Sequence, residues 1–425
     1  MVTRTTPLVV TALLVVALPA AGAAPPLPAG VSAVLYELAV PPGTEPTPEK
    51  VALGDKLFND KRLSVNDAVS CATCHDASKA FVDQKPLPDG VAAPKERPQR
   101  NSPTVVNAMF NATQFWDGRA PTLEEQAKLP ILNPIEMGQK APEDVVAKVR
   151  RIPEYAAAFP KIFGHEATYD DITAAIATFE RTQYAGDAPF DRYVAGDEKA
   201  IDAAAKRGWL IFNGKGRCSD CHAFSTVSPL FSDQKFHNIG IAAHKTDFID
   251  LARKAAGMVR GGDLKQVDEL AIQTHFSELG RFLVTKQAND IGAFKTPGLR
   301  NVAVTAPYMH DGSLATLWDV MDHYNKGGVP NPNLDGGMQR LGLTEAEIDD
   351  MVAFMQALTS ARFAGLAKQT MARQRARKNV RPERDTAAAT GRKGHLGDLA
   401  PPPDPAKPAA MGVLVVGGTS YEQAR

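Results

Sequence analysis

The sequence predicts a mainly α-helical, loop-rich fold built from two tandem domains of the same layout. The first observation is an order that occurs twice along the 425 residues: a helix, a Cys-x-x-Cys-His motif, a long irregular stretch and a closing amphipathic helix. The second is the content of 33 glycines and 32 prolines, which favours long irregular stretches between helices. A chain of this length can also hold two ordinary hydrophobic cores.

Each half is expected to open with a helix that leads into its motif. Thr47 directly before Pro48 is typical of a helix start with proline at the first helical position. That helix leads towards Cys71, and residues 203–212 form the corresponding helix before Cys218.

Each half is also expected to close with an amphipathic helix. Asp170 and Asp171 can cap residues 172–179, whose apolar side chains recur at helical spacing. In the second half, Thr344 and Glu347 match a capping box ahead of a further apolar stripe. We expect both stripes to be core that packs against the opening helices.

The N-terminus, residues 1–24, has the pattern of a signal peptide. Arg4 precedes an apolar run over residues 7–18, and small residues follow that run. The run is shorter than the roughly 20 residues that span a bilayer, which disfavours the alternative of a membrane anchor. We therefore expect an exported, periplasmic protein with no stable membrane span after cleavage. Lys plus Arg equal Asp plus Glu at 48 each, so no overall field favours nucleic acid as a partner.

The four cysteines all lie in two Cys-x-x-Cys-His units, which are Cys71, Cys74 and His75 in the first half and Cys218, Cys221 and His222 in the second. This pentapeptide is the attachment site of c-type haem. The thiols form thioethers to the haem, and the histidine becomes a ligand of the iron. Zinc sites and redox dithiols use the same residue types, but neither requires a histidine directly after the second cysteine. We predict two covalently bound haem c groups and, from the order of elements, two cytochrome c-like haem domains.

The predicted domains are residues 45–190 and residues 195–360. The second contains an insertion, residues 244–278, with two helical stretches whose function the sequence does not reveal. Residues 361–425 turn basic and then rich in proline and alanine, which predicts a disordered tail. The basic run is interpreted as solvated, the alternative being a docking site for an acidic redox partner.

Short segments that follow each motif resemble the bacterial di-haem cytochrome c peroxidase and MauG superfamily. They include Arg-Asn-Ser-Pro-Thr at 100–104, Phe-Trp-Asp-Gly-Arg at 115–119, Leu-Glu-Glu-Gln at 123–126, Asn-Pro-Ile-Glu-Met at 133–137, Phe-His-Asn-Ile-Gly at 236–240, Phe-Lys-Thr-Pro at 294–297 and Ala-Pro-Tyr-Met-His-Asp-Gly at 306–312. The resemblance covers roughly residues 45–360, in order and in both halves.

A peroxidase needs a haem with an open or displaceable distal position and a nearby acid–base group. No histidine occurs between His75 and His165, so the first haem has no local distal histidine. Many family members carry such a ligand, and its absence here implies a haem that is ready for peroxide without reductive activation. The resemblance implies that Glu136 is the acid–base group over this haem. Taken without the resemblance, Glu136 would be interpreted as a surface carboxylate near a turn.

The resemblance implies three further catalytic roles and one metal site. Gln126 would be a hydrogen-bond partner in the distal pocket, Pro130 its wall, and Trp116 an electron relay between the haems. Without the resemblance, Trp116 would be interpreted as a core residue. The calcium ligands implied between the haems are Asn101, Thr305 and Pro307, one side-chain amide oxygen and two backbone carbonyls, which are the hard donors that calcium prefers.

The second haem has three candidate distal ligands. Tyr324 stands where the peroxidases have methionine and where MauG-type enzymes have tyrosine. Met321 lies one helical turn earlier on the same face, and His323 is adjacent. A phenolate favours the oxidised iron, whereas a thioether raises the potential. We predict Tyr324, with Met321 and then His323 as alternatives.

These features predict an enzyme that reduces hydrogen peroxide with electrons from a small redox protein, a cytochrome c or a cupredoxin. The second enzymatic interpretation is MauG-like, peroxide-dependent oxidation of a side chain in a protein substrate, which Tyr324 favours. The interpretation outside enzymology is a di-haem electron-transfer cytochrome, which predicts two six-coordinate haems.

Overall fold

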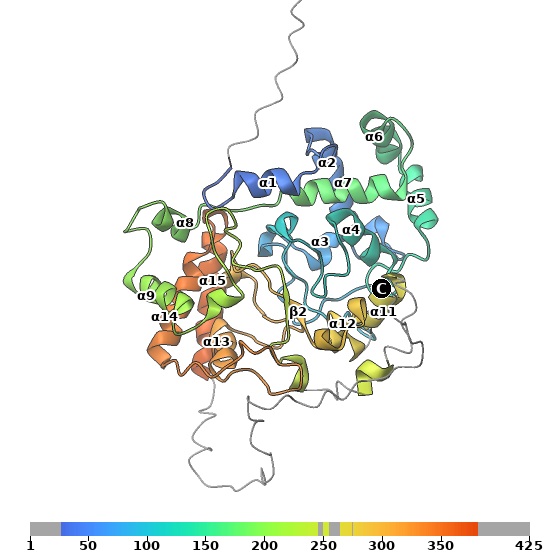
Figure 1. Ribbon diagram of the computed structural model, residues 1–425. Coiled ribbons are helices and arrows are strands. Elements are labelled where there is room, and N and C mark those ends of the chain that lie inside the picture. The colour runs from blue at the N-terminus through green and yellow to red at the C-terminus, as the bar shows by residue number, and fades with distance from the viewer. Residues whose placement is uncertain (1–26, 245–249, 255–263, 274, 381–425) are drawn as a thin grey trace, which may run out of the picture. The chain divides into compact units, whose positions relative to one another are not determined.

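The computed structural model describes residues 27–244, 250–254, 264–273 and 275–380 (Figure 1). The predicted signal peptide and residues 381–425 of the predicted tail lie outside the described residues. The fold is mainly helical, as predicted, with two short strands, β1 (Phe236–His237) and β2 (Phe294–Lys295), paired antiparallel. Within the described residues, no helix combines the length and apolar character that crossing a membrane requires.

The helices of the first half are α1 (Ala33–Ala39), α2 (Pro48–Asn59), α3 (Cys71–Cys74), α4 (Leu123–Leu132), α5 (Pro142–Arg151), α6 (Pro153–Phe163) and α7 (Tyr169–Arg181). Those of the second half are α8 (Pro189–Val194), α9 (Ala203–Asn213), α11 (Leu264–Gln273), α12 (Phe282–Thr285), α13 (Leu317–Asn325), α14 (Glu345–Ala357) and α15 (Ala364–Val380). Thr47 caps α2 with Pro48 at its first position, and Thr344 and Glu347 form a capping box on α14, both as predicted.

In each half, the opening helix packs closely on the closing helix. A methyl group on Gly54 of α2 would collide with the carbonyl of Ala175 and with Phe179 in α7. A methyl group on Gly208 of α9 would collide in the same way with α14, at Asp350 and Phe354. The two pairs of helices are the centres of two separate hydrophobic cores. The predicted stripes of apolar residues are therefore core, and they face the opening helices.

The loops between motif and closing helix repeat as well. Matched positions are Asn107 and Asn301 (φ 65° and 64°), Phe115 and Met309 (65° and 75°), Gly118 and Gly312 (68° and 65°), and the antiparallel bridges Gln114–Ala120 and Tyr308–Leu314. The offset along the chain is the same for every pair, and it also relates Thr122 and Thr316, the residues that cap α4 and α13. By that offset, Pro130 in α4 corresponds to Tyr324 in α13.

The prediction of a disordered tail from residue 361 was wrong for residues 361–380. Residues 364–380 form α15, and its Met371 and Gln374 are buried. Gln374 Oε1 accepts a hydrogen bond from the backbone of Leu317 at 2.8 Å, and its Nε2 donates to Tyr308 Oη at 3.1 Å. The composition of the segment reflects the exposed basic face, whereas one narrow buried face is enough to dock the helix on the second core.

The insertion contains the predicted second helix as α11, and residues 250–254 are helical. The rest of the first predicted helical stretch lies outside the described residues. A third hydrophobic core joins α11 and α12 to Ile135 in the first half, and the half-buried Trp116 packs against it. The insertion therefore contacts the two segments that carry Glu136 and Trp116.

Candidate active site

The two Cys-x-x-Cys-His motifs form similar single turns that present similar histidines. His75 Nδ1 lies 3.1 Å from the carbonyl oxygen of Phe81, and His222 Nδ1 lies 2.9 Å from that of Phe231. A carbonyl only accepts, so Nδ1 is the protonated nitrogen and Nε2 is left as the metal-binding nitrogen. Burial lowers the pKa of both imidazoles, which favours the neutral form that binds iron.

The four cysteines form no disulfide, and both motifs line one continuous cavity. The same cavity is lined by all of the predicted catalytic, distal and calcium residues except His323: Asn101, Trp116, Gln126, Pro130, Glu136, Thr305, Pro307, Met321 and Tyr324. Residues that are up to 253 positions apart in sequence, from Cys71 to Tyr324, thus meet at one site.

Glu136 is held by the end of α4. Pro134 follows the cap residue Asn133 and disfavours further helix, so the chain turns there. The Asn133 carbonyl accepts from the backbone of Glu136 at 3.1 Å, and the Glu136 carbonyl accepts from Val91 at 2.9 Å. The backbone is thereby fixed, while Glu136 Oε2 is buried without a hydrogen-bond partner.

The environment of Glu136 favours its neutral form. Burial, and after it the negative charge of Asp268, raise the pKa of Glu136 to about 8, whereas Arg119 opposes the shift. Such a carboxyl group changes its protonation state near neutral pH, as a general acid–base catalyst requires. The sequence interpretation gave no role to Arg119, which it quoted only within a family segment, or to Asp268, which reaches this region only through contacts between the two halves.

Trp116 lies beside the predicted calcium ligand Asn101. Its indole Nε1 donates to the backbone carbonyl of Asn101 at 2.9 Å. The Asn101 side-chain amide donates to the carbonyls of Lys85 and Pro86 at 2.8 and 3.3 Å. These bonds orient the amide, so that its oxygen remains available as a donor to a cation.

The three candidate ligands of the second haem differ in position. Tyr324 and Met321 line the cavity, and His323 is not among the described residues that line it. His323 Nε2 instead bonds to the carbonyl of Ile239 at 2.9 Å. Burial raises the pKa of the Tyr324 phenol, so a phenolate there requires a positive partner such as a metal ion.

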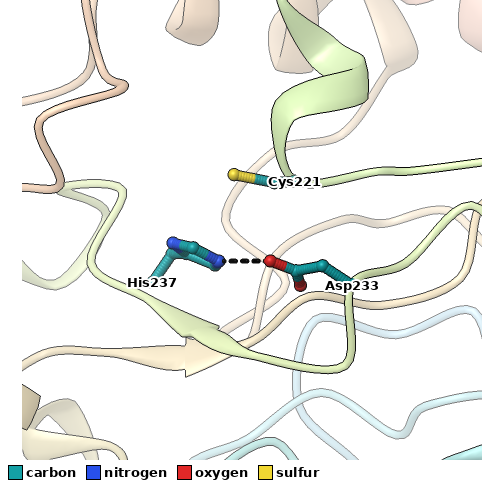
Figure 2. Close-up of side chains that lie close together, drawn as sticks. All are labelled: Cys221, Asp233 and His237. Carbon is teal, nitrogen blue, oxygen red and sulfur yellow. Dashed lines mark hydrogen bonds and ion pairs between the residues drawn. The ribbon is translucent and has the colours of Figure 1, made fainter.

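One group of side chains beside the second motif has the composition of a metal site. Figure 2 shows Cys221, Asp233 and His237, whose ligand atoms lie within 4.8 Å of one another. His237 Nδ1 lies 2.7 Å from an oxygen of Asp335, and its Nε2 lies 2.9 Å from Asp233. Cys221, and after it Asp335 and Asp233, raise the pKa of His237 to about 10. Because Cys221 belongs to a haem-attachment motif and His222 is not a member of the group, the group is better described as the surroundings of that motif than as a zinc site.

Comparisons with known proteins agree with this geometry. The model of a family described as di-haem cytochrome c peroxidase matches residues 48–199. The methylamine utilization protein MauG of Methylorubrum extorquens is 40% identical over 314 residues, which is 73% of this chain and 78% of that protein. Cytochrome c551 peroxidase of Pseudomonas aeruginosa is 37% identical over 310 residues, which is 72% of this chain and 78% of that protein. A solved structure of a MauG-like protein associated with microbial copper homeostasis has a TM-score of 0.61 and 31% identity, over 77% of this chain and 93% of that one.

The chain belongs to the di-haem cytochrome c peroxidase family. The family predicted from the short segments is confirmed, and so is the prediction of an oxidoreductase that acts on peroxide. Membership also implies haem as cofactor, and either a redox partner or a protein substrate.

Proposed function

We propose that the protein is a periplasmic peroxidase that holds two covalent haem c groups in two cytochrome c-like domains. Cys71, Cys74 and His75 would attach one haem, and Cys218, Cys221 and His222 the other. The neutral, oriented imidazoles and the single cavity at both motifs support this fit. When bound, the haems supply the redox chemistry that peroxide reduction requires.

The observation that carries the proposal is Glu136, a buried carboxyl group in the cavity with one oxygen unpartnered. Glu136 takes a proton from one oxygen of hydrogen peroxide and returns it to the other, so that water leaves as the O–O bond breaks. Gln126 donates a hydrogen bond to the peroxide, and Pro130 closes the pocket. Two electrons and two protons complete the conversion of peroxide to two molecules of water.

Trp116 relays electrons between the two motifs, and a small donor, a cytochrome c or a cupredoxin, supplies them. The position of Trp116 in the shared cavity and its bond to Asn101 support this role. Asn101, Thr305 and Pro307 would hold a structural Ca²⁺ there. All three residues line the cavity, and an amide oxygen and two backbone carbonyls have the donor chemistry for calcium.

A second candidate function, MauG-like oxidation of a protein side chain, is favoured by Tyr324. Tyr324 occupies the position that corresponds to Pro130, which supports the phenol rather than Met321 as the group over the second haem. A phenolate there stabilises the oxidised iron and disfavours electron uptake from ordinary donors.

Two measurements test the proposal. The denatured mature protein should exceed its polypeptide mass by two haems, and a mass gain of one haem or none would contradict it. Steady-state peroxide turnover with reduced cytochrome c and cupredoxin donors separates the two functions. Brisk turnover supports the peroxidase, whereas weak turnover together with oxidised Trp or Tyr in a neighbouring protein supports the MauG-like function.

A further inference from the structure

A set of buried charges joins α11 of the insertion to the segment that carries Glu136. Arg119 Nε and Nη2 donate to Asp268 Oδ1 at 2.9 and 2.7 Å. Asn133 Nδ2 donates to Asp268 Oδ2 at 2.6 Å. Both carboxylate oxygens of Asp268 therefore accept hydrogen bonds. Oδ1 accepts from Arg119, which follows Trp116 closely in sequence, and Oδ2 accepts from Asn133, which lies shortly before Glu136.

Arg119 is fixed on several sides. Its side chain is 0% exposed, and that of Asp268 is 5% exposed. Asp117 Oδ1 accepts from Arg119 Nη1 at 2.9 Å, and the guanidinium lies 3.6 Å from the centre of the Phe115 ring. Charged, buried hydrogen bonds of this kind are strong and directional. Arg119 is therefore held between Asp117 and Asp268, and turning to a third carboxylate would break at least one of these pairs.

The titratable and charged groups that act on Glu136 come from three elements. Asp268 is on α11, Arg119 is on the turn after Trp116, and the thiols of Cys71 and Cys74 are on α3. Attachment of haem converts both thiols to uncharged thioethers. Asp268 and Arg119 are then the two protein charges that decide, with burial, where Glu136 titrates.

We propose that Asp268 is a positioning residue of the active site, which holds Arg119 away from Glu136 and so leaves Glu136 free to accept and return the peroxide proton. The proposal rests on the acid–base role of Glu136 and gives the insertion a function, because α11 supplies the carboxylate. Among the described residues, no ion pair joins Arg119 to Glu136, and Glu136 Oε2 has no partner. If Arg119 paired with Glu136, it would stabilise the carboxylate and make it a weaker base towards the peroxide proton.

The test compares Asp268→Asn with Arg119→Gln in the holoprotein. Asp268→Asn removes a repulsive charge and releases Arg119, so Glu136 should titrate about one pH unit or more lower. Arg119→Gln removes the attractive charge, so Glu136 should titrate higher than in the wild type. Shifts of opposite sign from the two partners of one ion pair are not expected from a structural defect, which would move both variants in the same direction.

Two readouts follow the titration. The infrared carbonyl band of the protonated carboxyl group, assigned by its loss in Glu136→Gln, gives the midpoint without turnover. The pH dependence of the peroxide reaction gives the same midpoint kinetically. The rate should rise as Glu136 loses its proton, because only the carboxylate can accept a proton from peroxide. Glu269→Gln, on the same helix as Asp268, is the matched control and should keep the wild-type midpoint.

An infrared midpoint in Asp268→Asn equal to that of the wild type, with both haems bound, would overturn the proposal. If that variant fails to bind both haems, Arg119→Gln decides, and an unshifted or lowered midpoint there has the same consequence. An unimpaired Glu136→Gln enzyme would instead refute the catalytic role of Glu136, while the infrared midpoints would still report the action of Asp268.

Discussion

The wall of the cavity near His75 and the wall near His222 are built on the same backbone but carry different side chains. In both halves a capped helix follows a turn with glycine at positive φ, in the same register. In the first half that helix presents Pro130, a side chain that cannot bind iron. In the second half the matched position presents Tyr324, a side chain that can.

The turn before that helix differs in the same way. The first half has Trp116, which is suited to electron relay, where the second half has His310, whose Nε2 lies 3.0 Å from Glu278. Glu136 has no counterpart of the same type, since the constant offset leads from it to Pro330. The comparison teaches that one repeated scaffold can carry two differently equipped sites, since a few substitutions change the side chains that line the cavity near each motif.

The largest effect is expected from replacing Glu136, the carboxyl group that has no counterpart in the second half. Glu136→Gln keeps the size and burial of the side chain but cannot carry the peroxide proton. Stopped-flow measurement should give a peroxide reaction that is slower by a factor of roughly 10² to 10⁴, with both haems still bound. Glu180→Gln is a useful control, since Glu180 is another buried carboxyl group that lines the cavity, on α7. A comparable loss in both variants would mean that the effect is not specific to Glu136.

An intermediate effect is expected from making the second half resemble a methionine-ligated site. Tyr324→Met should change the spectrum of the second haem and raise its potential, because a thioether favours the reduced iron. Spectroscopy and redox titration would detect both changes. Met321→Leu is the control and should leave both properties unchanged. A spectrum and potential unaffected by Tyr324→Met, with a change in Met321→Leu, would assign the ligand to Met321.

Features that depend on neighbours in sequence could be predicted, and features that depend on distant contacts could not. The starts of α2 and α14 were predicted because the capping residues are local. The start of α7 was predicted too late, since Thr168 caps it and Asp171 completes the box. Helix α1, Ala33–Ala39, was not predicted, because its apolar side chains pack on a small fourth cluster whose residues, among them Met109 and Tyr184, are distant in sequence.

The candidate site divides in the same way. Both haem motifs, and the residues that the family segments mark, were named from sequence and lie in one cavity. Asp268 was not named from sequence, because nothing in the pattern of the insertion distinguishes it from the other charged residues on the same helix. Its role requires the packing of α11 on Ile135, which is visible only in three dimensions.

The smallest expected effect tests whether the two halves depend equally on close packing of their helices. Gly54→Ala and Gly208→Ala each add a methyl group where a backbone carbonyl and a phenylalanine already lie. Overpacking of this kind costs about 1–3 kcal/mol of the free energy of unfolding. Gly365→Ala, in α15, meets no atom within 4 Å and should be neutral or stabilising by about 0.4–1 kcal/mol, because alanine restricts the unfolded chain.

The stability of all three variants is measured by denaturation of the holoprotein, which is monitored through the loss of helix and through the spectrum of each haem. Similar losses in Gly54→Ala and Gly208→Ala would support equivalent helix crossings in the two halves. A Gly54→Ala protein as stable as the Gly365→Ala protein, beside a destabilised Gly208→Ala protein, would mean that α2 can move away from α7 and that only the second crossing requires glycine.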